Sequence, residues 1–166
     1  ALSGKSLIEL LFVKHSKQRV FLVGGDGGCW CHVGAHTVYH LIAAIGFCFG
    51  GLCVLDLARM GAQLKGVVSF HGLFIDSSEK PADTIHAKVL ALHGHDDPMS
   101  SQAQIDTFTQ EMTDLKVDWQ LHHYGHTVHA FTNPNANNPS RGTLYNEVAD
   151  KRAWQSMKNF LEEVLV

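Results

Sequence analysis

From about residue 40 onward, the chain alternates short apolar segments with segments rich in helix-forming residues. Most of the apolar segments are continuous runs rather than strict apolar–polar alternations, which is typical of parallel strands covered by helices on both faces. The last one alternates and is expected nearer the sheet edge. This order predicts an α/β fold with a mostly parallel sheet and helices on both faces. We expect strands at residues 39–46, 67–70, 88–93 and 117–121, and helices at residues 52–62, 101–114 and 144–164.

Length and composition exclude several classes of protein. The 166 residues fit one domain, which we assign to residues 1–166, and a hydrophobic content of 45% is sufficient for a globular core. A net charge of −3 gives no basic excess for nucleic-acid binding. The apolar stretch at residues 7–13 is too short to span a membrane. Four cysteines are too few for a disulfide framework, so we expect a cytoplasmic protein.

The sharpest motif, G-F-C-F-G-G, lies between the strand expected at 39–46 and the helix expected at 52–62. A nucleophile on a tight strand-to-helix turn needs small residues two positions before and two after it, and Cys48 has Gly46 and Gly50 there. The helix N-terminus favours a thiolate. The pattern identifies Cys48 as the candidate nucleophile and the amide of Phe49 as an oxyanion donor. The alternative is a buried Cys48 that acts only as a small hydrophobic side chain.

A cysteine nucleophile needs a base, and the base needs an acid to orient it. Asp97 follows the strand expected at 88–93, and His129 follows the strand expected at 117–121. Both therefore fall where the carboxyl ends of parallel strands form the sites of open α/β sheets. The chain order of nucleophile, acid and histidine is that of α/β-hydrolases.

Three motifs in register, G-F-C-F-G-G, A-L-H-G-H-D-D-P-M and V-H-A-F-T-N-P, resemble the dienelactone hydrolase family over about residues 41–166. The resemblance implies an α/β-hydrolase-type sheet and a catalytic triad of Cys48, Asp97 and His129. It further implies hydrolysis of an enol-lactone or related ester through a thioester, without a metal or other cofactor. The family's G-x-x-D pattern favours Asp97 as the acid, with Asp96 as the fallback.

Two departures from the family pattern modify this expectation. The residues before Cys48 are too few for all of the family's early strands, and residues 1–40 are poorly matched, so we expect a sheet that lacks early strands. A truncated chain or a catalytically silent α/β-hydrolase-like binding protein is the alternative. Dienelactone-specific members carry an Arg after the catalytic histidine, where this chain has Thr132 and Asn133. A broader carboxylic ester or lactone hydrolase, similar to a carboxymethylenebutenolidase, is therefore expected.

The remaining predictions concern the substrate and its surroundings. Phe47, Phe49 and Phe131 are expected to line an apolar substrate pocket, although core packing would explain Phe131 equally well. The glycine-rich segment at 24–28, after the strand expected at 19–23, is a candidate second oxyanion donor or a simple turn. We expect a small ester or lactone as the partner, and a monomer or homodimer.

One further cluster carries metal-ligand residue types. It consists of two cysteines separated by one residue, which is poor zinc spacing, followed by three histidines at helical spacing. Surface or partly buried histidines are the simpler interpretation, so we expect no metal site. The residues are Cys29, Cys31, His32, His36 and His40.

Overall fold

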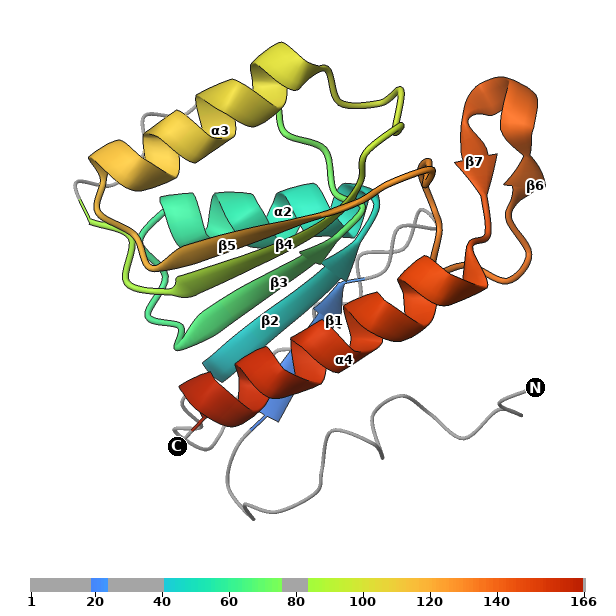
Figure 1. Cartoon of the computed structure of the whole chain (residues 1–166). Coiled ribbons are helices and arrows are strands. Elements are labelled where there is room, and N and C mark those ends of the chain that lie inside the picture. The colour runs from blue at the N-terminus through green and yellow to red at the C-terminus, as the bar shows by residue number, and fades with distance from the viewer. Residues whose placement is uncertain (1–18, 24–40, 76–83, 166) are drawn as a thin grey trace.

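The computed structural model describes residues 19–23, 41–75 and 84–165. A five-stranded parallel sheet forms the centre of the molecule, and the strands lie side by side in the order in which they occur along the chain (Figure 1). The predicted α/β class with a parallel sheet is therefore confirmed. The strands are β1 (Arg19–Val23), β2 (Leu41–Phe47), β3 (Gly66–Phe70), β4 (Lys88–Gly94) and β5 (Trp119–Tyr124).

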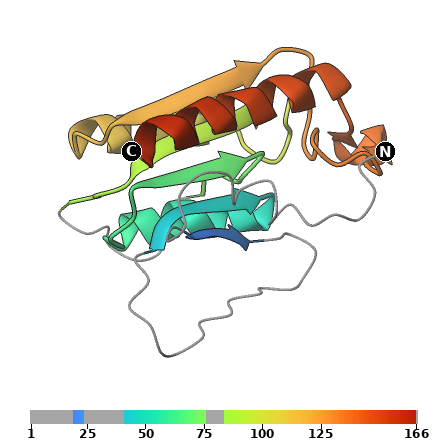
Figure 2. The ribbon, with the colours of Figure 1, turned by 90° about the horizontal axis from the view of Figure 1, so that it is seen from below.

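Helices cover both faces of this sheet, as the continuous apolar strands predicted. Helices α2 (Phe49–Arg59) and α3 (Gln102–Asp114) lie on one face, and α4 (Glu147–Val164) lies along the other (Figures 1 and 2). Successive side chains of a strand point to opposite faces. On β4, Val89 and Ala91 therefore pack with α2 and α3, whereas Leu90 and Leu92 pack with α4.

The boundaries of the helices follow local capping signals. Helix α3 begins with a capping box in which the Ser101 side chain accepts the Gln104 N–H and the Gln104 side chain accepts the Ser101 N–H. Helix α4 begins after Asn146, whose side chain accepts the Ala149 N–H. The prediction that α4 starts at residue 144 was wrong. Val148, which is 56% exposed, does not belong to its buried stripe.

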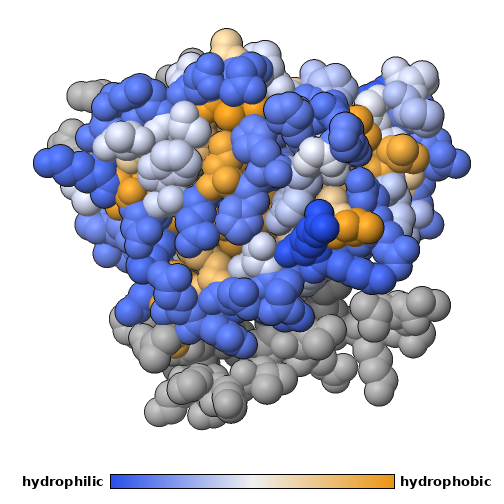
Figure 3. Space-filling model, viewed as in Figure 1, coloured by the Kyte–Doolittle hydropathy of each residue, from blue (hydrophilic) through white to orange (hydrophobic). Residues whose placement is uncertain are grey.

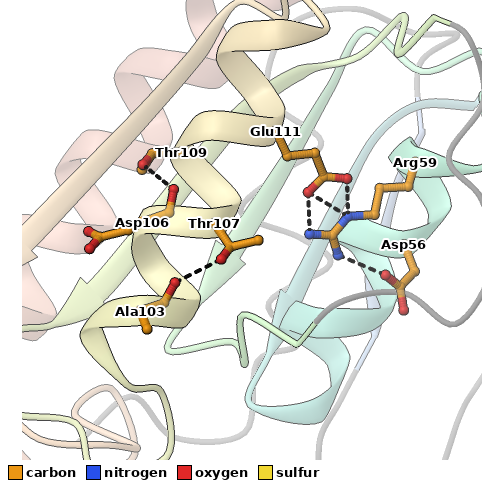
Figure 4. Close-up of polar contacts among 7 residues, drawn as sticks. All are labelled: Asp56, Arg59, Ala103, Asp106, Thr107, Thr109 and Glu111. Atoms are coloured by element: carbon orange, nitrogen blue, oxygen red, sulfur yellow. Dashed lines mark hydrogen bonds and ion pairs between the residues drawn. The ribbon is translucent and has the colours of Figure 1, made fainter.

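A buried ion pair joins α2 to α3 (Figure 4). The guanidinium of Arg59, which is 3% exposed, contacts the Glu111 carboxylate through Nη2 at 2.7 Å and through Nε at 2.9 Å. Asp56, one turn before Arg59, accepts a further hydrogen bond from Nη1 at 2.9 Å. Because a buried guanidinium must be paired, this contact fixes how the two helices sit against each other.

A small hairpin follows β5 and leads into α4. It comprises β6 (Asn137–Asn138), the 3₁₀ turn η1 (Pro139–Arg141) and β7 (Thr143–Leu144). The face seen in Figure 3 is mostly hydrophilic, with hydrophobic side chains in separate small groups. None of the helices in the described part of the chain is long and apolar enough to cross a membrane.

Candidate active site

Cys48 is the single residue between β2 and α2, on the tight turn that the glycine pattern predicted. Its backbone has φ 53° and ψ −121°, a positive-φ conformation that is rare outside glycine. Gly46 permits the turn, because a Cβ there would overlap the carbonyl group of Gly50. The Cys48 N–H donates to Phe70 O at 3.0 Å, which ties the turn to the end of β3. Helix α2 begins directly after Cys48, three residues earlier than the helical pattern predicted.

The structure brings Cys48, His129 and Asp97 into one chain of contacts. The Nε2 atom of His129 lies 3.1 Å from Cys48 Sγ, and its Nδ1 lies 2.8 Å from Asp97 Oδ2. Asp97 Oδ1 accepts the Met99 N–H at 2.9 Å. Asp97 and His129 are both buried, whereas Asp96, the fallback acid, is exposed. The geometry therefore places Asp97 rather than Asp96 against the histidine.

The loop after β5 holds His129 by its backbone. The His129 N–H donates to Gly142 O at 2.9 Å, and its carbonyl accepts the Leu144 N–H at 3.1 Å. The hairpin of β6 and β7 therefore holds the backbone of His129 through two hydrogen bonds. On the other side, the cap residue of α4, Asn146, donates through its side chain to Thr127 Oγ1 at 3.0 Å. These contacts limit the movement of the imidazole relative to Cys48.

The hydrogen bonds among these residues also shift the pKa values of Cys48 and His129. Burial alone would lower the pKa of His129, but hydrogen bonds to Asp97 and Cys48 outweigh it and raise the pKa to about 9. The hydrogen bond from His129 lowers the pKa of Cys48, against the opposing effect of burial, and the Phe49 N–H adds to the lowering. The arrangement therefore favours a thiolate beside an imidazolium, which is the reactive form of a cysteine nucleophile.

The three predicted phenylalanines occupy different environments. Phe49, next to Cys48 in the sequence, is 58% exposed. Phe47 is half-buried and stacks on Phe70 with ring centroids 4.6 Å apart. Phe131 is completely buried in the core beneath α4. Of the three, only Phe49 has a largely solvent-exposed ring next to the turn at Cys48.

Sequence reasoning missed two residues that contact the site, His71 and Thr132. His71 is the first residue after β3 and accepts the Cys48 N–H through Nδ1 at 3.2 Å. Its Nε2 lies 2.9 Å from Thr132 Oγ1. The signal in the sequence was a polar residue at the carboxyl end of a buried strand, V-V-S-F-H, beside the elbow strand.

Several other predictions lie outside the described residues. These are the glycine-rich segment at 24–28 and the candidate metal cluster of Cys29, Cys31, His32, His36 and His40. In the part of the chain that the structure describes, no group of three or more His, Cys, Asp or Glu residues could hold a metal ion.

Comparison with known proteins identifies the family of the chain. The family model described as the dienelactone hydrolase family matches residues 32–165. The chain belongs to the dienelactone hydrolase family. A similar solved structure in this group is a dienelactone hydrolase-like promiscuous phosphotriesterase from metagenomic libraries. It is 40% identical, with a TM-score of 0.69, and the match covers 75% of this chain and 53% of that chain.

Two curated relatives differ in how much of their length this chain covers. An uncharacterized protein of Caenorhabditis elegans is 34% identical over 74% of this chain and 79% of its own length. A Saccharolobus solfataricus protein, provisionally named carboxymethylenebutenolidase, is 27% identical over 97% of this chain and 59% of its own length. The chain thus spans most of the nematode protein but little more than half of the archaeal protein and of the solved phosphotriesterase chain.

Proposed function

We propose that this member of the dienelactone hydrolase family cleaves a small carboxylic ester or lactone with Cys48 as nucleophile, His129 as base and Asp97 as the acid that orients it. The observation that carries the proposal is the contact of 3.1 Å between His129 Nε2 and Cys48 Sγ. The lowered pKa of Cys48 and the raised pKa of His129 support a thiolate–imidazolium pair. Hydrolysis fits the family, and the thiolate–imidazolium pair favours a route through a thioester.

In the first half-reaction, the Cys48 thiolate attacks the carbonyl carbon of the ester. The carbonyl oxygen becomes an oxyanion, which the Phe49 N–H at the start of α2 stabilises. When the intermediate collapses, the bond to the leaving oxygen breaks and His129 gives its Nε2 proton to the alkoxide. The products of this step are an alcohol and a thioester on Cys48.

In the second half-reaction, neutral His129 takes a proton from water, and the hydroxide attacks the thioester carbonyl carbon. Collapse releases the carboxylic acid and restores the Cys48 thiolate beside protonated His129. Asp97 holds the imidazole through Nδ1 in both steps, so that Nε2 always faces the sulfur.

The substrate class follows from the site rather than from a relative's name. Thr132 and Asn133 follow the base and offer no positive charge for a substrate carboxylate. We therefore propose an uncharged ester or lactone, with the exposed Phe49 ring against its apolar part. A thiolate nucleophile also suits a reducing compartment such as the cytoplasm.

The test is trapping of the thioester. The full chain is incubated with a panel of p-nitrophenyl esters, small lactones, a dienelactone and a phosphotriester, and the peptide that carries Cys48 is analysed by mass spectrometry. We expect p-nitrophenol release and an acyl group on Cys48. Cys48→Ala should abolish both, whereas Cys53→Ala, a half-buried cysteine further along α2, should retain them.

The rival function is an α/β-hydrolase-like binding protein without turnover, which is favoured by the chain's covering only about half of the solved relative's length. It predicts ligand binding without alcohol release and without acylated Cys48. Equal hydrolysis by the unaltered chain and by Cys48→Ala would overturn the proposed nucleophile.

A further inference from the structure

His71 has an unusual backbone next to the nucleophile. Its φ is 38°, in the positive-φ region that residues other than glycine occupy uncommonly. Its side chain is 3% exposed, and its backbone N–H donates to Leu92 O at 2.8 Å. A strained backbone of this kind persists only where the surrounding contacts hold it, and it is most frequent at functional sites.

The hydrogen bonds of His71 fix the position of its ring proton. The Cys48 backbone N–H can only donate, so the Nδ1 atom that accepts it at 3.2 Å is unprotonated. The ring proton therefore lies on Nε2, and it is donated to Thr132 Oγ1 at 2.9 Å. Both ring nitrogens are occupied, one by the nucleophile's own backbone and the other by the loop that carries the base.

The same ring contacts the base. Its centroid lies 5.0 Å from the centroid of the His129 ring, in an edge-on arrangement, and 5.3 Å from that of Phe131. Burial lowers the pKa of His71 to about 3, and the neighbouring His129 adds to the lowering while Asp97 opposes it. His71 therefore stays neutral near pH 9, where His129 changes charge.

We propose that His71 is a positioning residue, a neutral imidazole protonated on Nε2 that links the Cys48 backbone to Thr132 and so fixes the separation of nucleophile and base. The inference rests on the proposed function of Cys48 and His129. The Cys48 N–H is shared between Phe70 O and His71 Nδ1, so without His71 the turn would keep its bond to β3 but lose its direct connection to the loop after β5. A displacement of about 1 Å between reacting groups costs up to about a hundredfold in rate.

Thr132→Val tests the positioning role with little change to the structure, because it removes one hydroxyl and preserves the shape of the side chain. The assay is the rate of Cys48 alkylation by iodoacetamide between pH 5 and 10, followed by peptide mass spectrometry, which needs no substrate. We expect Thr132→Val to react about tenfold more slowly near neutral pH, with a pH profile displaced toward that of an ordinary thiol. Thr132→Ser, which keeps the hydroxyl, should restore the original profile.

Thr109→Val is the matched control. Thr109 lies on α3, and its hydroxyl donates within that helix, to Asp106 O at 3.0 Å. The substitution should leave the pH profile of Cys48 alkylation unchanged. With an ester that the chain hydrolyses, Thr132→Val should reduce kcat and leave KM within about twofold, because only the alignment of reacting groups changes.

Two further measurements address His71 directly. In ¹⁵N spectra of the imidazole, its Nε2-protonated tautomer should persist from pH 5 to 9. His71→Phe removes both hydrogen bonds, and adding Thr132→Val to it should cause no further loss, since the two residues form one link.

The outcomes separate this inference from the proposed function. If Cys48 of the unaltered chain is alkylated no faster than an ordinary thiol, the proposed function fails and the positioning role fails with it. If Cys48 is fast in the unaltered chain but Thr132→Val keeps its profile, only the positioning role is overturned. A His71 ring protonated on Nδ1 would overturn that role as well.

Discussion

Gly51 at the start of α2 and Gly72 just after β3 pack so closely that a Cβ on Gly51 would lie 2.7 Å from the Cα of Gly72. No side chain larger than hydrogen fits between α2 and the segment that carries His71. The two glycines therefore set the depth at which α2 sits on the sheet, and with it the position of Cys48.

Gly51→Ala is expected to destabilise the fold by about 1–3 kcal/mol, because the added methyl group overpacks this contact. It should also slow Cys48 alkylation, since α2 must move outward. Chemical denaturation and peptide mass spectrometry measure the two effects. Gly125→Ala is the control: a Cβ there meets nothing within 4 Å, so its stability should stay within about 0.5 kcal/mol of the original.

Asp97→Asn should leave the fold intact and reduce kcat by between about 10² and 10⁴, because an amide no longer enforces the imidazole tautomer that presents Nε2 to the sulfur. Asp96→Asn changes the exposed neighbour and should retain activity. Steady-state kinetics on one ester compares the two variants. A larger loss in Asp96→Asn than in Asp97→Asn would show that the acid has been misassigned.

The pH dependence of hydrolysis should be bell-shaped. As pH falls through the lowered pKa of Cys48, the thiolate gains a proton and the rate decreases. As pH rises through about 9, His129 loses the proton that the leaving group needs, and the rate decreases again. In His129→Gln, Cys48 alkylation should instead follow the titration of an ordinary thiol near pH 8.5. An unaltered alkylation profile in that variant would contradict the ion pair.

Phe49→Ala should raise KM for esters with apolar acyl groups and change stability by no more than about 0.5 kcal/mol, because the ring is 58% exposed. Phe47→Ala should show the reverse pattern, with little effect on KM and a loss of stability. Its ring packs on Phe70 and Trp154, so the change should cost up to about 3 kcal/mol in stability. Kinetics with a series of acyl chain lengths, together with thermal unfolding, distinguishes the two roles.

Glu111→Gln should destabilise the protein by about 1–3 kcal/mol, because it leaves the buried Arg59 guanidinium with Asp56 as its remaining carboxylate partner. Glu147→Gln breaks the exposed pair with Lys151 and should cost far less. Urea unfolding of both variants tests the comparison. Equal losses in the free energy of unfolding would show that burial of Arg59 does not increase the contribution of its ion pair to stability.

The strand-to-helix turn at Cys48 was predictable because the residues that define it are adjacent in the sequence. The strand ending at Phe47, the glycines at 46 and 50, and the helix that follows are adjacent in the sequence. Asp97 and His129 were predictable as candidates because both follow parallel strands, and parallel strands bring their carboxyl ends to one edge. Their contact with Cys48 depends on distances that no local pattern contains.

What escaped prediction depends on backbone turns and on long-range contacts. His71 has a positive φ and contacts the Cys48 N–H from the neighbouring strand, and the local pattern V-V-S-F-H-G does not predict that turn. The hairpin of β6 and β7 has two-residue strands that carry no hydrophobic period, so the start of α4 was placed too early. The buried residues of α4 begin only at Ala149.

The order of the strands has a consequence for how the protein is made. Because neighbours in the sheet are also neighbours in the chain, each strand can join the sheet edge as it leaves the ribosome. Cys48 is synthesised 81 residues before His129, which corresponds to roughly 4–16 s of translation. During that interval the cysteine has no base beside it. On the proposed function, Cys48 therefore becomes reactive only after the loop following β5 has brought His129 to it.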